Sequence, residues 1–329
     1  MRAFSVYHAA LCEGLPDTSA ECLSVSSKTE TSVRHAVLVL NPAAGRGRAT
    51  RAANQVEQAV RAALEHRWPG CRLRLVETSL DRGAEVLARL AIEGGADLLI
   101  AAGGDGTLHG VVNAAAGTSA IAAHIPLGTG NDFARAIGIP SDIAGAVRVL
   151  MQGRVAPMDL GCHDGRYFIN VAGCGLDAVV AQRVNSRYRA ARGRLAYLVA
   201  VLASLMSYRA VPMTVRAGGM VIQDRMMLCA VANGISYGGG MRIAPQARWD
   251  DGLLDVCIVR ECGALEFLRA FPLVFSGKHL NHPKVQYLRA KAVHVASDPP
   301  VPVLMDGEVT GFTPARFGIA PGVLLFLAP

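Results

Sequence analysis

The 329-residue sequence contains no uncharged apolar run as long as the roughly 18 residues that a membrane-spanning helix requires. The longest candidate, Leu195–Tyr208, has 14 residues and fits a buried or interfacial helix better. The N-terminus also lacks the apolar core of a secretory signal. Its first 33 residues combine Ser, Thr, Glu and Asp with few bulky apolar side chains, so we expect residues 1–33 to form a loosely ordered extension of a cytoplasmic protein.

The usual metal and disulfide patterns are missing as well. The eight cysteines are scattered without a CxxC pair, and the nine histidines show no HExxH spacing. These absences argue against a zinc site and against a disulfide framework. Several cysteines lie in apolar, strand-like runs, so we expect reduced and buried thiols.

The sequence also lacks Gly-x-x-x-x-Gly-Lys-[Ser/Thr], which excludes a P-loop protein. Residues 173–178 match the Gly-x-Gly-x-x-Ala pattern of dinucleotide sites, but that pattern requires an acidic residue about 20 positions later. Residues 178–223 contain no Asp or Glu at all. We therefore interpret residues 173–178 as a tight turn between a strand and a helix.

The same acid-free stretch contains seven arginines, which equals the formal net charge of +7, so the rest of the chain is neutral on balance. Such a basic block favours an anionic surface nearby, whether a membrane, a phosphate or a nucleic acid. An ordinary solvated basic face is the alternative that charge alone leaves open.

The length and the apolar fraction of 51% predict two well-packed domains. Strand-like and helix-like patterns alternate over residues 34–155. This alternation predicts an α/β domain with a parallel, doubly wound sheet, whose ligands bind at the carboxyl ends of the strands. Three polar or Gly-rich loops, 41–47, 103–107 and 128–132, follow such strands.

Short β-type segments dominate residues 156–317 and predict a mostly antiparallel β-sandwich as the second domain. A helix near 176–208 is the exception. The final segment, about 318–329, either stays with this domain or returns to the first. The predicted strands cover residues 167–172, 213–217, 226–232, 254–259, 292–295, 301–305 and 324–327.

The loop at residues 103–107 reads Gly-Gly-Asp-Gly-Thr and lies between an apolar strand, 98–102, and the start of a helix. Glycines allow a sharp turn and close approach of a ligand, and the amides of a helix start can bind a phosphate. Asp105 adds an oxygen ligand suited to Mg²⁺. A purely structural Gly-rich turn is the alternative.

Five short motifs occur in order between about Arg34 and the C-terminus. They are Asn-Pro-x-x-Gly-x-Gly at 41–47, Gly-Gly-Asp-Gly-Thr at 103–107, Pro-Leu-Gly-Thr-Gly-Asn-Asp-Phe-Ala-Arg at 126–135, Asp-Asp-Gly-Leu-Leu-Asp-Val at 250–256 and Met-Asp-Gly-Glu at 305–308. Together they resemble the catalytic domain of the diacylglycerol kinase and sphingosine kinase superfamily, most closely its soluble bacterial lipid kinases. The resemblance implies an NAD-kinase/phosphofructokinase-like α/β domain, a β-sandwich, and an active site between them.

The resemblance further implies transfer of the γ-phosphoryl group of ATP to a lipid hydroxyl, with Mg²⁺ as the metal. The interval from Thr78 to Gly83 is one residue longer than the family pattern implies, so Ser79 is the alternative to Thr78. The implied nucleotide-binding residues are Asn41, Gly45, Thr78, Gly103, Gly104, Asp105, Gly106, Thr107, Leu108, His109, Thr129, Asn131 and Asp132.

For catalysis, the resemblance implies Glu308 as the proton acceptor, Asp105 as the organiser of Mg²⁺ and Asp306 beside Glu308. Two carboxylates two residues apart in a strand point to the same face, so we expect Asp306 and Glu308 to share one site. A plain β-turn is the alternative for Asp-Gly-Glu. His109 stands where many relatives carry Asn, which makes nucleotide affinity pH-sensitive in principle.

A second metal site is also implied by the resemblance. Its ligands would be the carbonyl groups of Arg248 and Leu253 and the carboxylate of Asp251. Ligation by oxygen alone suits Mg²⁺ or Ca²⁺. The alternative is a turn at Asp251-Gly252 that only enters the following strand.

We predict an ATP-dependent lipid kinase of phospholipid biosynthesis that acts on diacylglycerol or a related lipid. It would be cytoplasmic and transiently bound to an anionic membrane surface, with no nucleic-acid partner and with a homodimer left open. The alternatives are an NAD kinase-like small-molecule kinase and a non-catalytic nucleotide- or lipid-binding regulator. Segments 128–135 and 250–256 argue against the first, and the intact carboxylates at 105, 132, 306 and 308 argue against the second.

Overall fold

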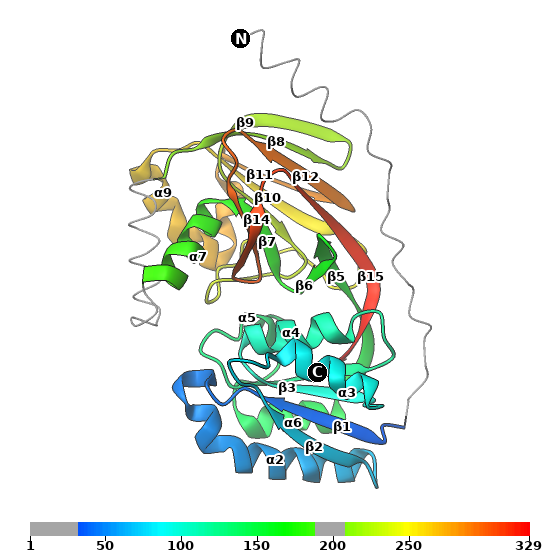
Figure 1. Cartoon of the computed structure of the whole chain (residues 1–329). Coiled ribbons are helices and arrows are strands. Elements are labelled where there is room, and N and C mark those ends of the chain that lie inside the picture. Colours follow the sequence, from blue (N-terminus) through cyan, green and yellow to red (C-terminus); the bar gives the residue numbers. More distant parts are fainter. Residues whose placement is uncertain (1–31, 188–207) are drawn as a thin grey trace.

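The computed structural model describes residues 32–187 and 208–329, which form two bodies, one above the other in Figure 1. The lower body holds the N-terminal α/β domain, and the upper body consists mainly of β-strands. Residues 1–31 of the expected N-terminal extension and most of the expected Arg-rich apolar segment up to residue 208 lie outside the described residues. Val33, the last residue of the expected extension, is buried in the core. None of the helices in the two described ranges is both long and apolar enough to cross a bilayer.

The lower body contains a parallel sheet in the order β2-β1-β3-β4. Every residue of β3 and β4 is buried, because helices cover both faces of the sheet, and this explains their continuous apolar sequences. The predicted parallel α/β domain is confirmed. Its strands are β1 (His35–Leu40), β2 (Arg72–Glu77), β3 (Leu98–Gly103) and β4 (Ile121–Pro126).

Helices α2 and α6 pack against each other on one face of this sheet, whereas α3 and α4 pack together on the other. Figure 1 shows α4 on the side that faces the upper body. The short element η1 lies within the predicted ligand loop 41–47, and α5 begins at the last residue of loop 128–132. The bounds are η1 (Ala44–Arg46), α2 (Arg48–Arg67), α3 (Ala84–Glu93), α4 (Asp105–Ala115), α5 (Asp132–Ile137) and α6 (Ile143–Gln152).

The upper body is antiparallel, with strands in the order β14-β13-β7-β9-β8-β12-β15 and with β10 and β11 continuing from β9. The predicted β-rich second domain is therefore confirmed. Its strands include β6 (Arg166–Phe168), β7 (Val171–Gly175), β8 (Val211–Ala217), β9 (Met220–Ala232), β10 (Leu254–Arg260), β11 (Val285–Ala290), β12 (Ala292–Ser297), β13 (Pro302–Met305) and β14 (Glu308–Phe312). Its helical elements are α7 (Leu176–Arg187), α9 (Ala264–Ala270), η2 (Phe271–Ser276) and η3 (Lys278–Asn281).

One predicted strand, 167–172, is divided in the structure. The backbone N–H groups of Ile169 and Asn170 donate to the Asp306 carboxylate instead of to a neighbouring strand, so β6 ends before them and β7 begins after them. The interpretation of residues 173–178 as a tight turn is confirmed, because β7 leads directly into α7. A Cβ on Gly173 would lie 2.7 Å from the carbonyl oxygen of Cys229.

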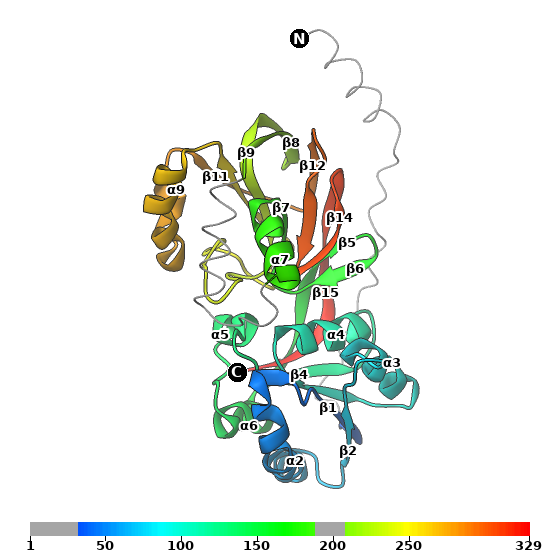
Figure 2. The same cartoon turned by 60° about the vertical axis from the view of Figure 1, so that its left-hand side comes forward.

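Two long strands, β5 (Arg154–His163) and β15 (Ala315–Ala328), run through both bodies (Figure 2). Near its C-terminal end β15 pairs in parallel with β4, and near its start it pairs antiparallel with β12. Strand β5 pairs with β15 along most of this length. The pairing of β5 with β15, interrupted by a register shift between Ala320 and Leu324, thus joins the two bodies and fixes the loops of one opposite the other.

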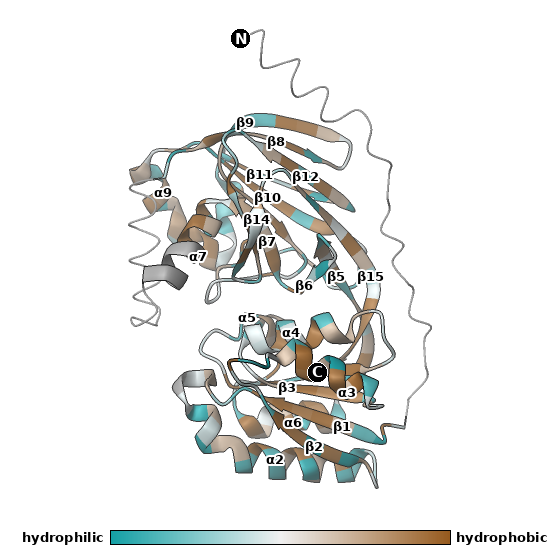
Figure 3. Ribbon diagram, in the orientation of Figure 1, coloured by the Kyte–Doolittle hydropathy of each residue, from teal (hydrophilic) through white to brown (hydrophobic). Residues whose placement is uncertain are grey.

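The apolar residues gather inside both bodies, as the brown ribbon of Figure 3 shows. One buried cluster surrounds β1, β3 and β4 and includes the end of β15, and three smaller clusters fill the upper body.

Candidate active site

The loops that follow β3 and β4 touch through their glycines. A Cβ on Gly128 would lie 2.6 Å from the Cα of Gly104, and a Cβ on Gly103 would overlap the side chain of Thr107. Any residue larger than glycine would push these backbones apart. Loops 103–107 and 128–131 therefore form one surface at the carboxyl ends of two neighbouring strands.

This surface lines a cavity of about 380 Å³. The Asn41 amide donates to Thr107 Oγ1 at 3.1 Å, which ties the loop after β1 to α4. Helix α4 begins at Asp105 without a side-chain cap, so the N–H groups of its first turn suit an anion such as a phosphate. The lining residues are Asn41, Ala43, Ala44, Gly45, Gly104, Asp105, Gly106, Thr107, Gly128, Thr129 and Gly130.

A larger cleft of about 790 Å³ lies on the other side of loop 128–131, between α2, α5 and the start of α6. The Arg48 guanidinium at its edge donates to the carbonyl oxygens of Gly45 and Gly128. Arg48 thus ties two loops together, and the glycine loops separate this cleft from the smaller cavity.

Thr78 follows β2, and its N–H donates to the carbonyl oxygen of Leu40 at 2.8 Å, directly before Asn41. The hydroxyl of Ser79, by contrast, accepts the N–H of Arg82 within a local turn. Of the two alternatives, Thr78 therefore lies beside the loop that carries Asn41. Neither residue lines the 380 Å³ cavity.

The carboxylates of half-buried Asp105 and buried Asp132 both lie next to Gly130. A Cβ on Gly130 would lie 3.1 Å from Asp105 Oδ2 and 3.8 Å from Asp132 Oδ2. Burial raises the pKa of Asp105, and the charge of Asp306 raises it further, although the Phe133 N–H opposes both. Burial also raises the pKa of Asp132, and the charge of Asp105 adds to that effect.

These two carboxylates suit a divalent cation. Both carboxylates have an oxygen within 4 Å of the same point beside Gly130, and the charge of Asp105 raises the free energy of ionising Asp132. Mg²⁺ is commonly held by one or two carboxylates together with phosphate oxygens and water. Within residues 32–187 and 208–329 no cluster of three or more His, Cys, Asp or Glu side chains is placed to hold a metal. A cation here would therefore complete its coordination with a bound phosphate.

Asp306 and Glu308 do not lie along one strand, which corrects the geometry expected from the sequence. Strand β13 ends at Met305, β14 begins at Glu308, and Asp306 and Gly307 form the turn of a hairpin with positive φ angles of 44° and 94°. The plain β-turn is therefore the observed backbone. Both charges nevertheless act on His109, so the two carboxylates lie near the same side chain.

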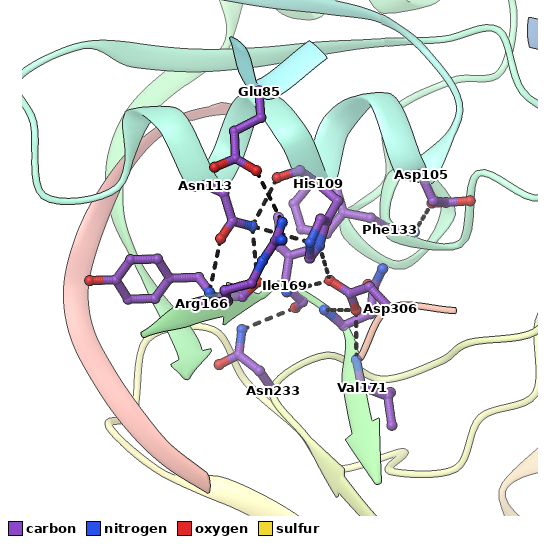
Figure 4. A network of polar contacts seen from close by, with 12 residues as sticks. Glu85, Asp105, His109, Asn113, Phe133, Arg166, Ile169, Val171, Asn233 and Asp306 are labelled. Atoms are coloured by element: carbon purple, nitrogen blue, oxygen red, sulfur yellow. Dashed lines mark hydrogen bonds and ion pairs between the residues drawn. The ribbon is translucent and has the colours of Figure 1, made fainter. Parts of the chain in front are cut away.

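The Asp306 carboxylate is surrounded by protein donors (Figure 4). Oδ2 accepts the N–H of Ile169 at 2.8 Å and faces His109 Nδ1 at 3.0 Å. Oδ1 accepts the N–H groups of Asn170 and Val171 at 3.0 and 3.1 Å. Asp306 therefore fixes the turn that carries Glu308, whereas Glu308 itself is exposed.

His109 lies on α4, one turn after Asp105, and connects this helix to the turn at Asp306. Burial alone would lower the pKa of His109, but the hydrogen bond with Asp306 and the charges of Asp306 and Glu308 outweigh burial and raise it. Its other ring nitrogen lies 3.3 Å from the Asn113 amide. His109 does not line the 380 Å³ cavity.

Two further contacts join the bodies beside His109 (Figure 4). The Asn113 side chain donates to the carbonyl oxygen of Tyr167 at 3.0 Å and accepts its N–H at 2.9 Å. Arg166 pairs with Glu85 of α3 at 3.0 Å. Helices α3 and α4 of the lower body thus each bind a residue of the upper body, through Glu85 and Asn113 respectively.

The remaining residues expected to bind the nucleotide differ in which of their atoms a ligand can reach. Thr129 lines the cavity, and Gly45 does so with a φ of 60°. Leu108 is fully buried in the core, so only its backbone is available to a ligand. Asn131 has a φ of 51° and donates to the carbonyl oxygen of Gly128, and its buried Oδ1 has no hydrogen-bond partner among the described residues.

The implied second metal site stays a prediction. Asp251 Oδ1 accepts the N–H of Leu253 at 3.1 Å, and Oδ2 lies 3.7 Å from the Arg289 guanidinium. Arg248 lies in the same turn, and its guanidinium pairs with Asp250 at 3.0 Å. A cation at this turn would have to replace Arg289 as the partner of Asp251.

Sequence reasoning did not identify two contacts that place the β domain at the site. Asp132 Oδ2 accepts the N–H of Gly239, from the loop between β9 and β10, at 2.7 Å. Buried Asp159 accepts the N–H groups of Gly252 and Gly322, both at 2.7 Å. A lone acid within an apolar strand was the available signal for Asp159, and no local pattern indicates Gly239.

Comparisons with known proteins agree with this arrangement. The diacylglycerol kinase catalytic domain model matches residues 35–163, and the model of the YegS C-terminal NAD kinase beta sandwich-like domain matches residues 170–328. The diacylglycerol kinase of Staphylococcus carnosus (strain TM300) is 35% identical over 242 residues, which cover 71% of this chain and 77% of that protein. This chain belongs to the diacylglycerol kinase family.

Other members of the family give the same result. The diacylglycerol kinase of Bacillus subtilis (strain 168) is 36% identical over 224 residues, covering 67% of this chain and 74% of that protein. The crystal structure of a diacylglycerol kinase from Bacillus anthracis str. Sterne has a TM-score of 0.69 at 25% identity, covering 92% of this chain and 98% of that chain. The similarity to family members thus extends over both bodies.

Proposed function

We propose that this member of the diacylglycerol kinase family transfers the γ-phosphoryl group of ATP to the hydroxyl group of diacylglycerol or a closely related lipid. The observation that carries the proposal is the position of the Asp306–Glu308 turn. This turn, from the β domain, approaches the same helix, α4, whose first turn lines the 380 Å³ cavity. Phosphoryl transfer needs both a phosphate cradle and a base for the attacking hydroxyl.

In this proposal the exposed Glu308 accepts the proton of the lipid hydroxyl. The hydroxyl oxygen forms a bond to the γ-phosphorus, the bond to the β,γ-bridging oxygen breaks, and ADP leaves. Asp306 positions Glu308, because its own oxygens accept bonds from three backbone N–H groups and face His109. The phosphates are bound by Thr129 and by the start of α4, Asp105–Thr107. Asn41 and Thr78 contribute to binding of the nucleotide.

Asp105 and Asp132 would hold Mg²⁺ together with the phosphate oxygens. When bound, the ion would neutralise charge that develops on the transferring phosphoryl group. Without it, the carboxylates of Asp105 and Asp132 would face a polyphosphate and repel it. The chain's own contribution is to keep both carboxylates in place, through the N–H groups of Phe133 and Gly239.

A lipid substrate also agrees with a small apolar cavity of about 80 Å³ in the β domain. Its walls include Phe267 and Phe271, and also Tyr237 and Met241 from the loop whose Gly239 contacts Asp132. The substrate comes from a membrane, so the enzyme would bind a membrane surface transiently.

The proposal is tested with γ-³²P-labelled ATP and a panel of acceptors, each assayed with and without Mg²⁺. The panel contains diacylglycerol, phosphatidylglycerol, ceramide, a sphingoid base and NAD. We expect Mg²⁺-dependent labelling of diacylglycerol or a close relative. Labelling of NAD alone would support an NAD kinase, and nucleotide binding without any labelled product would support a non-catalytic regulator.

A further inference from the structure

An exposed apolar surface lies on α9 and η2, at the side of the β domain. Four of the ten exposed large hydrophobic side chains of the described residues fall within eleven positions of the sequence. Figure 2 shows α9 beside the sheet, at the outer left side of the upper body. They are Leu265 (62% exposed), Leu268 (37%), Leu273 (38%) and Phe275 (48%).

The opposite side of the same segment is apolar too. Phe267 and Phe271 stack at a ring-centroid distance of 6.0 Å and line the 80 Å³ cavity, and Phe275 packs edge-on against Phe271 at 5.9 Å. A row of three phenyl rings therefore runs from the cavity to the solvent. A helical segment that is apolar on both sides is normally covered on both sides, and here nothing among the described residues covers the outer one.

The charged side chains around this surface that do not form ion pairs are positive. Glu261 pairs with Arg225 at 2.9 Å, and Glu266 pairs with Lys284 at 2.9 Å. The exposed side chains of Arg242, Arg269 and Lys278 have no ion-pair partner within the described ranges 32–187 and 208–329. Exposed apolar tips surrounded by unpaired cations are typical of elements that insert into an anionic lipid interface.

This surface is connected to the candidate active site by a short stretch of backbone. The N–H of Gly239 donates to Asp132, and three residues later the N–H of Arg242 donates to the carbonyl oxygen of Val274 in η2. Three residues span at most about 11 Å. A membrane on this surface would therefore lie close to the carboxylates of the site.

We propose that the outer face of α9 and η2, formed by Leu265, Leu268, Leu273 and Phe275 with Arg242, Arg269 and Lys278, docks on an anionic phospholipid bilayer. The proposal rests on the proposed function, because it names the surface from which a lipid kinase takes its substrate. It differs from the membrane contact expected for the Arg-rich segment before residue 208, which lies mostly outside the described residues.

The test is vesicle co-sedimentation with two compositions, phosphatidylcholine alone and an equal mixture with phosphatidylglycerol. One variant carries Leu265→Asp and Phe275→Asp, and a second carries Arg269→Glu and Lys278→Glu. The matched controls are Met220→Asp with Val221→Asp, at another exposed apolar pair, and Arg51→Glu with Arg148→Glu, at two other exposed cations. All substituted side chains are at the surface, so each protein is expected to fold, and circular dichroism checks this.

We expect the wild-type protein to prefer the anionic vesicles and to be released by salt, because exposed charges are screened over about 8 Å at physiological ionic strength. Each cation near an anionic surface changes affinity roughly fivefold, so both patch variants should bind at least about tenfold more weakly. The controls should stay within about twofold of wild type. Unchanged vesicle binding of the patch variants would overturn the proposal, as would patch substitutions that only change the oligomeric state, since the surface would then bind a second copy.

Vesicle binding needs neither ATP nor turnover, so its outcome is separate from that of the proposed function. In parallel, each variant is assayed on a short-chain, water-soluble diacylglycerol and on diacylglycerol in anionic vesicles. The docking proposal predicts normal rates on the soluble substrate and reduced rates on vesicles for the patch variants. A wild-type protein that binds vesicles through this surface but phosphorylates neither substrate would refute the proposed function and leave the docking surface standing.

Discussion

Two neighbouring carboxylates with raised pKa values, Asp105 and Asp132, are the main residue-scale feature of the site. Asp105 and Asp132 accept backbone N–H groups, yet burial raises the pKa of each, with a further rise from the charge of Asp306 at Asp105 and from the charge of Asp105 at Asp132. Such groups lower the stability of the folded chain at neutral pH. Their retention in the chain makes sense if they act on a ligand instead of on the fold, since active sites commonly trade stability for function.

The variant Asp105→Asn tests whether the Asp105 carboxylate lowers stability and is required for activity. Because the pKa of Asp105 is raised in the folded chain, its contribution to stability falls as the pH rises from the ordinary value of an aspartate, about 4. The variant should therefore unfold at a higher temperature than wild type at pH 7, with the difference shrinking towards pH 4, and its kinase activity should fall by about 10²-fold or more. Thermal unfolding at the two pH values and a kinase assay check both halves. A fully active variant would make the loop structural.

His109 supplies a second test, with the opposite consequence for stability. The folded chain raises its pKa, through Asp306 and Glu308 and against burial and the charge of Arg166. The extra stability is therefore fully present below about pH 6.5, the ordinary pKa of a histidine, and is lost as the pH rises through the raised value.

His109→Asn keeps an N–H donor for Asp306 without a titrating ring. We expect the unfolding temperature of wild type to fall relative to that of the variant between pH 6 and pH 8.5. Differential scanning calorimetry of the two proteins across this range measures the effect. Curves that stay parallel would show that His109 does not titrate there.

At the scale of elements, the glycine contact between the loops after β3 and β4 decides the shape of the phosphate cradle. Gly128→Ala would place a Cβ 2.6 Å from the Cα of Gly104, where only backbone movement can relieve the overlap. We expect nucleotide affinity to fall at least about tenfold, as measured by isothermal titration calorimetry with an ATP analogue. Gly311→Ala, in β14 with nothing within 4 Å of the added Cβ, is the matched control and should bind normally. Equal affinities would mean that the loops do not form the cradle.

The elements were predictable from sequence where a local pattern determines them. Buried parallel strands such as β3 read as apolar runs, and the Gly-Gly-Asp-Gly-Thr loop marks both a strand end and a helix start. The turn at Asp306 was expected as part of a strand, because the alternation of side chains was applied across Asp-Gly-Glu. The donors that fix this turn come from residues 169–171, about 135 positions earlier, and no local pattern could show them.

At the scale of the whole molecule, the arrangement of the two bodies follows from long-range contacts that the sequence does not reveal. The return of β15 to pair with β4 was one of two alternatives for the final segment, and its pairing depends on register across the sheet. Asp159 joins β5 to the turns at Gly252 and Gly322 with one buried carboxylate. These contacts bring the candidate base of the β domain to the phosphate cradle of the α/β domain, which is the central claim of this account.

The most direct test of that claim is the initial rate of ³²P transfer from γ-labelled ATP to a water-soluble, short-chain diacylglycerol, compared between wild type and Glu308→Gln. The account predicts Mg²⁺-dependent transfer by wild type and a kcat at least about 10²-fold lower for the variant, with ATP affinity nearly unchanged, because Glu308 removes a proton and does not hold the nucleotide. A variant with near-normal turnover, or a wild-type protein that labels no lipid, would contradict it.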